Sequence, residues 1–327
     1  MERQVFEPTT KRGYSFSKPY LHNGLMFAGL PSYVECAETL NVSSGICQET
    51  RICVLDGTTH RTTVIDVLPT ASVITAPTFE SFHQIFNDGG CNVLAGEKID
   101  LLTGHQEEVK SGDFVLGSNL FSKEPIALVT RNEDQQFSDF CNWIIQALIT
   151  SEELRAGGPS TTLSDLPIPP FFGDSFSYMF YDAVSLVGDY GQVYERHLEQ
   201  YVPRSEANRI NSGESPAMLA LPFGNTQPDV VPNVSGGKLG AIRERGHLRC
   251  GISAGAVFAE FDGSEWSGLD ISFCQALSAA IFDGDIYVRY NVLDPTERFQ
   301  ALQNDLVDVL ARITTYTMER DVLEPSI

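Results

Sequence analysis

Basic residues are scarce in this sequence: 22 Lys and Arg stand against 43 Asp and Glu, which gives the 327 residues a formal net charge of −21. A chain of this charge is repelled at long range by phosphate backbones and anionic membrane surfaces, so we expect no nucleic-acid partner. Long apolar runs are lacking too, since none approaches the roughly 20 residues that cross a bilayer. Met1–Pro8 shows no basic segment followed by an apolar stretch, and we expect any export signal to have been removed or to lie upstream.

Metal-binding spacings are also lacking. The seven cysteines include no Cys-x-x-Cys pair and the six histidines are scattered, so no zinc-ligand spacing is present. We therefore expect neither a metal nor another cofactor. Two interpretations of the cysteines stay open at this point: they are buried free thiols, or they form disulfides in an oxidising compartment.

The length and composition are those of a globular protein with two domains. The chain has 42% hydrophobic and 20% charged residues, and it is longer than one core usually organises. Strand and helix patterns alternate along it. Ile52–Leu55 is a short strand pattern that breaks at Asp56–Thr59 and leads into a helix through Val67, while Phe79–Phe86 has apolar residues at helical spacing before a strand at Cys91–Leu94. This alternation predicts an α/β fold with largely parallel sheets and ligand sites at the carboxyl ends of strands.

The second half of the chain continues the alternation. Its expected helices lie at 137–154, 178–201, 266–282 and 298–303, and its expected strands at 248–252 and 307–310. Residues 156–175 are rich in Gly, Pro and Ser and predict a long loop. Residues 223–237 show no periodicity and predict a linker at a domain boundary.

The two ends of the chain repeat one another. Residues 1–10 and 318–327 are identical at six of ten positions, which has odds on the order of one in a hundred thousand at typical residue frequencies. Residue 318 therefore repeats residue 1, and the chain is expected to be one period of a tandem array with a short overlap, or a circular permutant.

Two sets of motifs carry a resemblance to a known family. The first set is Ile242-Arg-Glu-Arg-Gly-His-Leu-Arg-Cys-Gly251, Trp266-Ser-Gly-Leu-Asp-Ile-Ser-Phe-Cys274, Arg298-Phe-Gln-Ala-Leu302 and the run Asp308–Arg320. The second set is Phe16–Tyr20, Cys53–Thr59, Gly90–Val93, Ser122-Lys-Glu-Pro125 and Val187–Arg196. The first set resembles the start, and the second the later part, of the polar amino-acid-binding proteins of ABC transporters (extracellular solute-binding family 3), closest to the general L-amino-acid-binding branch.

The resemblance implies a two-lobed periplasmic-binding-protein fold of type II, circularly permuted, with the ligand cleft between the lobes. Residues 1–122 would form lobe 2, and 123–222 together with 238–317 would form lobe 1, joined through the linker at 223–237. Residues 318–327 would be the overlap that repeats 1–10. The hinge strands would lie at about 120–130 and about 311–317.

The resemblance also implies where the ligand carboxylate binds. Arg320 occupies the position of the carboxylate-binding arginine, and Arg3 occupies the same position in the second copy. Thr315 would add a hydroxyl or an amide. Gly57, Thr58 and Thr59, at a helix N-terminus, would offer backbone N–H groups to the same carboxylate, although a Gly-Thr-Thr run is also typical of a simple helix cap.

Three further residues complete the expected site. Glu97 falls where the family has its ammonium-binding aspartate, so this chain carries one more methylene there. Phe258 would be the aromatic shelf, or a core residue. Arg312 would tune the side-chain end of the ligand, or form a structural salt bridge.

The resemblance assigns six of the seven cysteines to disulfides and implies an oxidising compartment. Cys141 would stay a buried thiol. The implied pairs are Cys53 with Cys91, Cys250 with Cys274, and, as a third pair, Cys36 with Cys47.

The function implied by the resemblance is reversible capture of a free amino acid by hinge closure, without enzymatic activity. The protein would act outside the cytoplasm, and its protein partner would be a transporter permease. Two alternatives stay open. One is a structural repeat of an extracellular or organellar assembly that has lost its ligand, and the other is a dehydratase-like enzyme. The repeated ends also suggest neighbouring repeats, or self-association in which the C-terminal decamer docks on another molecule.

Overall fold

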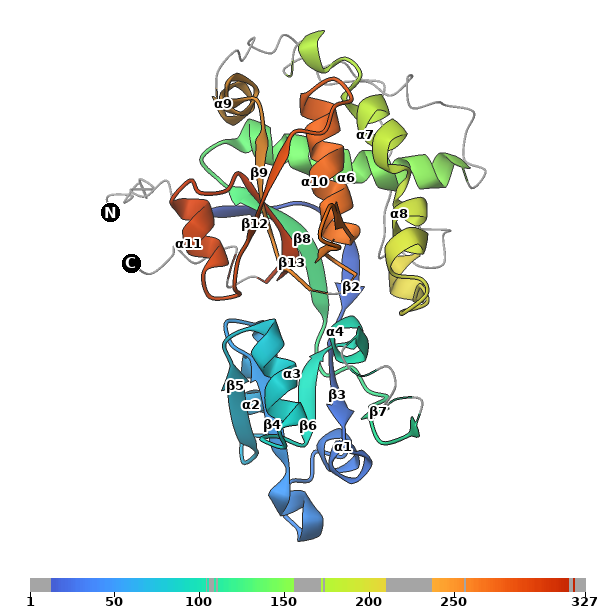
Figure 1. Cartoon of the computed structure of the whole chain (residues 1–327), viewed down its shortest axis with the longest axis vertical. Helices are drawn as coiled ribbons and strands as arrows, with labels where there is room; N and C mark the ends of the chain where they lie inside the picture. The colour runs from blue at the N-terminus through green and yellow to red at the C-terminus, as the bar shows by residue number, and fades with distance from the viewer. Residues whose placement is uncertain are drawn as a thin grey trace, which may run out of the picture.

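The computed structural model describes residues 13–103, 105, 109, 111–155, 172, 174–209, 237–255, 257–317 and 320. These residues form two lobes, a larger one above a smaller one in Figure 1. Arg3, residues 223–236 of the expected linker and, apart from residue 320, the repeated decamers lie outside the described residues. The permuted order and the tandem repeat therefore stay predictions.

The larger lobe is built on a six-stranded sheet. Strand β9 (Leu248–Ile252) runs parallel to the edge strand β12 (Val288–Val292) on one side and to the central strand β13 (Val309–Thr315) on the other. On the other side of β13, strand β8 (Glu124–Arg131) pairs antiparallel with it, and also with the short strands β1 (Tyr14–Phe16) and β2 (Leu21–Asn23). The helices of this lobe are α6 (Gln135–Arg155), α7 (Met179–Val187), α8 (Tyr190–His197), α9 (Gly237–Arg245), α10 (Leu269–Ile281) and α11 (Arg298–Gln303). Its shortest elements are the hairpin β10 (Glu260–Phe261) with β11 (Trp266–Ser267), and the 3₁₀ turns at Asp174–Phe176 and Glu206–Asn208.

The smaller lobe contains a five-stranded sheet in the order β5-β4-β6-β3-β7. Strand β4 runs parallel to both β5 and β6, whereas β3 is antiparallel to β6 and β7. These strands are β3 (Leu25–Gly29), β4 (Arg51–Leu55), β5 (Ser72–Ala76), β6 (Val93–Glu97) and β7 (Val115–Leu116). The helices are α1 (Pro31–Glu38), α2 (Thr59–Val67), α3 (Phe79–Asn87), α4 (Lys98–Thr103) and the 3₁₀ turn Gly45–Glu49.

The α/β fold class expected from the sequence is confirmed, with three local differences. Both sheets are mixed, because the strands next to the joint between the lobes run antiparallel to their neighbours. The helix expected at 178–201 is two helices, since Gly188 interrupts it with φ 88°, a conformation that favours glycine. Helix α10 begins at Leu269 rather than at 266, because Gly268 has φ 135° and the two residues before it pair as a strand.

Strands β1 and β2 belong to the sheet of the larger lobe, although the sequence assigned residues 1–122 to the other lobe. Their partner is β8, which extends from the larger lobe toward the smaller one in Figure 1. Strands β8 and β13 fall at the positions expected for the two hinge strands, and they pair with each other along the joint. A chain that crosses between lobes here gains the backbone hydrogen bonds of an extended sheet.

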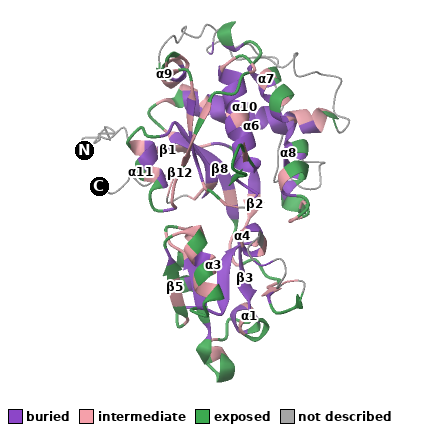
Figure 2. Cartoon of the chain, in the orientation of Figure 1, coloured by how far each residue is buried: buried purple, intermediate pink, exposed green. Residues whose placement is uncertain are grey.

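Each lobe has its own hydrophobic core, visible as the buried purple elements of Figure 2. The largest cluster packs α6, α7 and α10 against the six-stranded sheet, and includes Phe140, Phe180 and Phe273, each without measurable exposure. The smaller lobe buries separate clusters around its sheet, one containing Leu25 and another Leu94. Ile99 of α4 joins the cluster of the larger lobe, but the other members of the smaller lobe's clusters pack within that lobe, so most of the apolar burial survives a change in the angle between the lobes.

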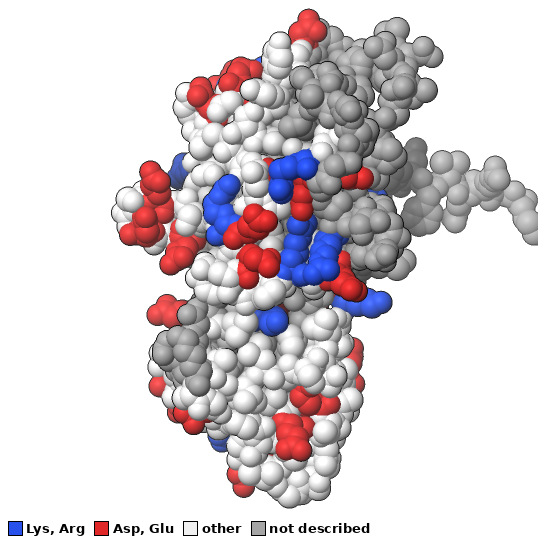
Figure 3. All heavy atoms as spheres, turned by 90° about the vertical axis from the view of Figure 1, so that its right-hand side faces the viewer, with Lys and Arg blue, Asp and Glu red and all other residues white. Residues whose placement is uncertain are grey.

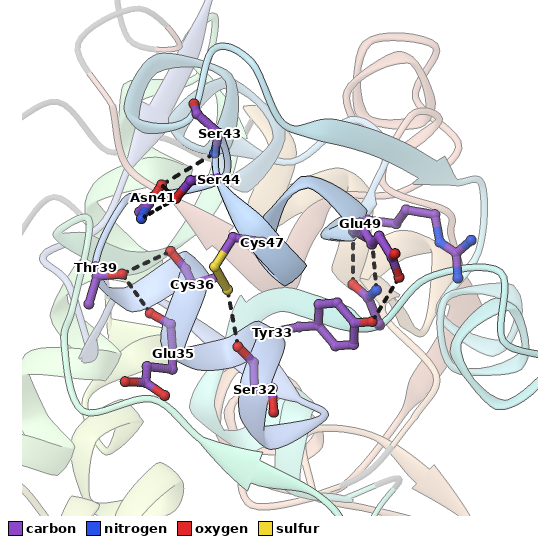
Figure 4. The surroundings of a disulfide bond; sticks show 12 residues. Ser32, Tyr33, Glu35, Cys36, Thr39, Asn41, Ser43, Ser44, Cys47 and Glu49 are labelled. Atoms are coloured by element: carbon purple, nitrogen blue, oxygen red, sulfur yellow. Dashed lines mark hydrogen bonds between the residues drawn. A yellow bond between two sulfur atoms is a disulfide. The ribbon is translucent and has the colours of Figure 1, made fainter.

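All three disulfides implied by the family resemblance are formed. Cys53 of β4 is bonded to Cys91 just before β6, and Cys250 of β9 is bonded to Cys274 of α10. Figure 4 shows the third, which ties Cys36 of α1 to Cys47 in the following 3₁₀ turn. Cys141 is a buried free thiol, as expected.

Charged side chains are unevenly spread over the face drawn in Figure 3, where basic and acidic groups mingle on the larger lobe and much of the smaller lobe is uncharged. Within the larger lobe, Arg204 pairs with Glu152 of α6, and Arg155 pairs with Asp189 at the start of α8. These pairs fix α6 against the segment around α8. Within the described part of the chain, no helix combines the length and the apolar character that crossing a membrane requires.

Candidate functional site

A cavity lies between the two lobes, and residues of both lobes line it. The cavity has a volume of about 50 Å³. The larger lobe contributes residues of β13, the start of α11 and the loops after β9 and β12, while the smaller lobe contributes the end of β6 and the starts of α2, α3 and α4. The expected site residues that line it are Thr58, Thr59, Glu97, Arg312, Thr315 and Arg320.

The loop before α2 forms one wall and is in close contact with the opposite lobe. Gly57 has φ 68°, and a Cβ placed on it would lie 3.0 Å from Thr296 Cγ2 and 3.1 Å from the carbonyl carbon of Pro295. Gly57 is thus required for two reasons: its positive φ, and the close approach of its backbone to Pro295 and Thr296. The Thr58 hydroxyl donates to the Leu55 carbonyl at 2.6 Å, and α2 has no side-chain cap. The positive end of α2 therefore faces the cavity without a capping side chain, which suits an anion.

A buried carboxylate joins the two lobes at this wall. The hydroxyls of Thr59 and Thr315 each donate to Glu124 Oε2 at 2.6 Å, and the Ser122 hydroxyl donates to Oε1 at 2.8 Å. Thr59 and Thr315, both expected at the ligand site, lie side by side, with their Oγ1 atoms 3.5 Å apart. Glu124 was not predicted from the sequence. It is 2% exposed and accepts from the hydroxyls of both Thr59 and Thr315, although Thr315 was expected to offer a hydroxyl or an amide to the ligand and Thr59 a backbone N–H. The signal was present in the Ser122–Pro125 motif at the expected hinge.

Opposing effects set the pKa of Glu124. Burial pushes it upward, but His60 and the three donated hydroxyls outweigh burial, so the pKa ends below its ordinary value. His60 Nε2 lies 4.0 Å from Glu124 Oε1 and 3.9 Å from Glu97 Oε1. Burial lowers the pKa of His60, against the opposing pull of Glu124. The side chains of His60 and Glu124 are thus held close together beneath the cavity.

The acidic side of the cavity comes from the smaller lobe. Glu97 ends β6 and is 2% exposed, and its Oε2 atom has no hydrogen-bond partner among the described residues. Burial, followed by the charges of Asp100, Glu124 and Asp270, raises the pKa of Glu97 well above its ordinary value. Burial also raises the pKa of Asp100, in α4, to about 7. A cationic group that enters here would restore the ionised forms of these carboxyls.

The basic side comes from the larger lobe and its C-terminal continuation. Arg320 Nη1 donates to the Thr315 carbonyl at 2.8 Å, which holds this guanidinium beside the cavity. Arg312 is 4% exposed and its Nε donates to the Leu293 carbonyl at 2.7 Å; burial lowers its pKa to about 10. A third arginine, Arg298 of α11, lines the cavity and was not expected there, although the Arg298–Leu302 motif is one of those that carry the family resemblance.

Phe258 does not line this cavity, which corrects the expectation of an aromatic shelf. It is 1% exposed and packs in the core of the larger lobe, and its carbonyl accepts from the backbone N–H of Asp270 at the start of α10. The rings at the cavity belong to Phe79 and Phe82 of α3. Gly255 approaches Phe79 so closely that an added Cβ would lie 3.3 Å from its ring. The core interpretation of Phe258 therefore holds.

Comparison with curated proteins finds relatives for part of the chain, while no family model matches it. The chain is 42% identical over 90 residues to the putative amino-acid ABC transporter-binding protein YhdW of Escherichia coli K12, a match covering 27% of this chain and 26% of that protein. It is 40% identical over 85 residues to the general L-amino acid-binding periplasmic protein AapJ of Rhizobium johnstonii, 25% of each chain. The chain thus spans about a quarter of the length of the curated relatives it matches.

A solved structure extends the likeness to about two thirds of the chain. The ABC transporter periplasmic binding protein of Brucella ovis with glutathione bound superposes with a TM-score of 0.51 at 18% identity, covering 65% of this chain and 71% of that one. The chain has the fold of a periplasmic binding protein. The type II periplasmic-binding-protein fold expected from the sequence is therefore confirmed, and the cavity described above lies between its two lobes.

Proposed function

We propose that the chain binds a free amino acid reversibly between its lobes. The observation that carries this proposal is the division of charge across one cavity, with guanidinium groups from one side and carboxyl groups from the other. Arg320, with the positive end of α2, would bind the α-carboxylate, and Glu97 would accept from the ammonium. No covalent step is needed for this function. The amino-acid-binding relatives support the proposal over a quarter of their length.

In this proposal the ligand binds to residues of both lobes, so binding requires the lobes to close on each other. Arg298 of the larger lobe donates to the Gly57 carbonyl of the smaller lobe at 3.2 Å, and Glu124 joins Thr59 to Thr315 across the joint. These contacts form only when the lobes are together. A zwitterion bridging Arg320 and Glu97 would favour the same arrangement, because it interacts with both lobes at once.

The cellular setting follows from the disulfides and the relatives. Three disulfides persist in an oxidising compartment and would be reduced in most cytosols. Relatives of part of the chain are named as ABC transporter-binding and periplasmic proteins. These observations support our proposal that the protein works outside the cytoplasm, with a transporter permease as its partner.

One observation favours a second candidate, a structural repeat that no longer binds a ligand. Glu124 already accepts from both threonine hydroxyls, so its carboxylate takes donors that a ligand would use. The repeated ends of the sequence agree with such a role. If molecules or repeats exchange their terminal decamers, sedimentation and intact mass will show an assembly; a strict monomer contradicts the exchange.

Calorimetry against the twenty amino acids tests the proposal. We expect at least one to bind, and Arg320→Ala to weaken it by about a hundredfold, the effect of losing a bidentate charged pair. Arg289→Ala, at an exposed position of β12, is the matched control and should bind like the wild type. An Arg3→Ala variant shows whether the second copy of the arginine contributes. Absence of binding to all twenty overturns the proposal in favour of the structural repeat, whereas turnover of a prephenate-type compound would favour the dehydratase alternative.

A further inference from the structure

The chain crosses between the lobes after β2 and again just before β8. Gly24 separates β2, in the sheet of the larger lobe, from β3, in the sheet of the smaller lobe. A Cβ added to Gly24 would lie 2.3 Å from the carbonyl oxygen of Ser122, so the two crossings are in direct backbone contact. The connection is narrow at this point, and a small change in the backbone here alters the angle between the lobes.

On the side of the smaller lobe, the two crossing segments are bonded to each other. The Leu25 N–H donates to the Ser122 hydroxyl at 3.0 Å, and the Leu25 carbonyl accepts from the Phe121 N–H at 2.9 Å. Leu25 is also paired with Glu97 in the register of β3 and β6. The first residue after the crossing is therefore tied to the strand that carries Glu97, and the two move together.

On the side of the larger lobe, a side chain fixes the last residues before the crossing. Strand β2 pairs with β8 so that His22 lies opposite Pro125, which has no N–H to donate. The side-chain amide of Asn208 binds His22 instead. Its Oδ1 accepts from the His22 N–H at 2.6 Å, and its Nδ2 donates to the His22 carbonyl at 2.9 Å. Asn208 thus takes the place of one residue of a further strand along the outer edge of β2.

Asn208 is itself held in one orientation. It is 5% exposed, and Nδ2 also donates to the Ser205 hydroxyl at 3.1 Å, so the amide is bonded on all sides that face the protein. Arg204 donates to the Asn208 carbonyl, pairs with Glu152 of α6, and lies over the ring of Tyr190, 4.8 Å from its centroid. The side chain that binds β2 is therefore anchored to the helices of the larger lobe.

We propose that Asn208 is a positioning residue for binding: by fixing His22 to the larger lobe, it confines the rotation between the lobes to the residues around Gly24 and sets where Glu97 lies when the lobes close. The part that concerns Glu97 rests on the proposed function, whereas the restraint on rotation does not. Without Asn208, β2 moves with the smaller lobe, and the closed arrangement is a smaller fraction of the molecules. Apparent affinity falls with that fraction, although no contact to the ligand is lost.

The first measurement needs no ligand. Small-angle X-ray scattering of the complete chain should give a larger radius of gyration for Asn208→Ala than for the wild type, because the less restrained lobes separate more widely. Asn87→Ala, at the exposed last residue of α3, is the matched control and should scatter like the wild type. An unchanged radius of gyration in folded Asn208→Ala overturns the inference.

The second measurement is calorimetry with each of the twenty L-amino acids. Those that bind the wild type should bind Asn208→Ala about tenfold more weakly, as expected when two hydrogen bonds that support the closed arrangement are lost. Equal affinities overturn the inference even if Asn208→Ala is less stable, since a purely structural role would lower stability alone. If no amino acid binds the wild type, the proposed function is wrong, and scattering decides the inference.

A second variant keeps the test decisive if Asn208→Ala does not fold. Asn208→Asp retains the acceptor for the His22 N–H and loses the donor to the His22 carbonyl. It must then increase the radius of gyration, and weaken the binding of any amino acid that the wild type binds. A folded Asn208→Asp that matches the wild type in both measurements overturns the inference.

Discussion

The carboxylate of Glu124 offers the sharpest test of how the lobes are joined. Glu124→Gln removes its charge and almost nothing of its volume. In the wild type three hydroxyls donate to it, two at 2.6 Å and one at 2.8 Å, and the side chain is buried. In the variant, the amide oxygen can keep both threonine bonds and the amide N–H can donate to the Ser122 hydroxyl. The fold should therefore persist with weaker contacts across the joint.

The magnitude follows from the difference between charged and neutral hydrogen bonds. Each bond to a carboxylate contributes about 1 kcal/mol more than its neutral counterpart, and there are three; the smaller cost of burying an amide offsets part of the loss. We expect the free energy of unfolding to fall by about 2 kcal/mol at neutral pH, measured by urea titration. Glu244→Gln, at an exposed position of α9, is the matched control and should change the free energy of unfolding little.

The pH dependence of this difference is a second, independent readout. The pKa of Glu124 in the folded protein is below its ordinary value, so the charge stabilises the fold above the unfolded pKa, and this stabilisation is lost as the pH falls through the folded pKa. The gap between wild type and variant should be constant from about pH 8 to about pH 5 and shrink below about pH 4.5. Equal stability at neutral pH, or a gap that widens on acidification, would refute the reasoning.

Three further predictions concern binding and stability. Burial raises the pKa of Glu97, so the affinity for an amino acid, measured by calorimetry, should fall as the pH drops through this raised pKa. The Glu97→Gln variant should bind about tenfold more weakly and lose this pH dependence. An unchanged pH profile in the variant would contradict the role of Glu97. Replacing both cysteines of the Cys53–Cys91 disulfide by alanine should lower the free energy of unfolding by about 4 kcal/mol, and the same change at Cys36–Cys47 by about 3 kcal/mol. The difference arises because the first disulfide closes a loop of 38 residues and the second a loop of 11. The reverse order in urea titrations would count against this account. Asp308→Asn should lower the free energy of unfolding by about 3 kcal/mol in the same assay, because the buried carboxylate of Asp308 pairs with three cationic side chains. A decrease below about 1 kcal/mol would show that these ion pairs are not needed for stability.

The elements that sequence periodicity predicted best are those whose pattern is local. The strand at Ile52–Leu55, the turn at Gly57 and the helix after it lie where expected, because apolar spacing and a glycine at positive φ are properties of neighbouring residues. The sequence-based predictions were wrong where three-dimensional packing decides the role of a residue. Phe258 satisfies the pattern of a shelf or of a core residue equally well, and only the packing of α10 against it shows that it belongs to the core.

The expected site residues came from the family resemblance. The sequence by itself determined the α/β class, the acidity of the chain and the positions of the main helices and strands, because these depend on residue type and on spacing along the chain. The tertiary structure decided which polar groups meet and which are left without a partner. Glu124 joins hydroxyls that lie 65 and 191 residues away in the chain, and Arg298 is undercompensated because burial and two other arginines surround it. Burial and pairing are set by segments that are distant in sequence, so a local motif such as Ser122–Pro125 can mark a residue but does not show its partners.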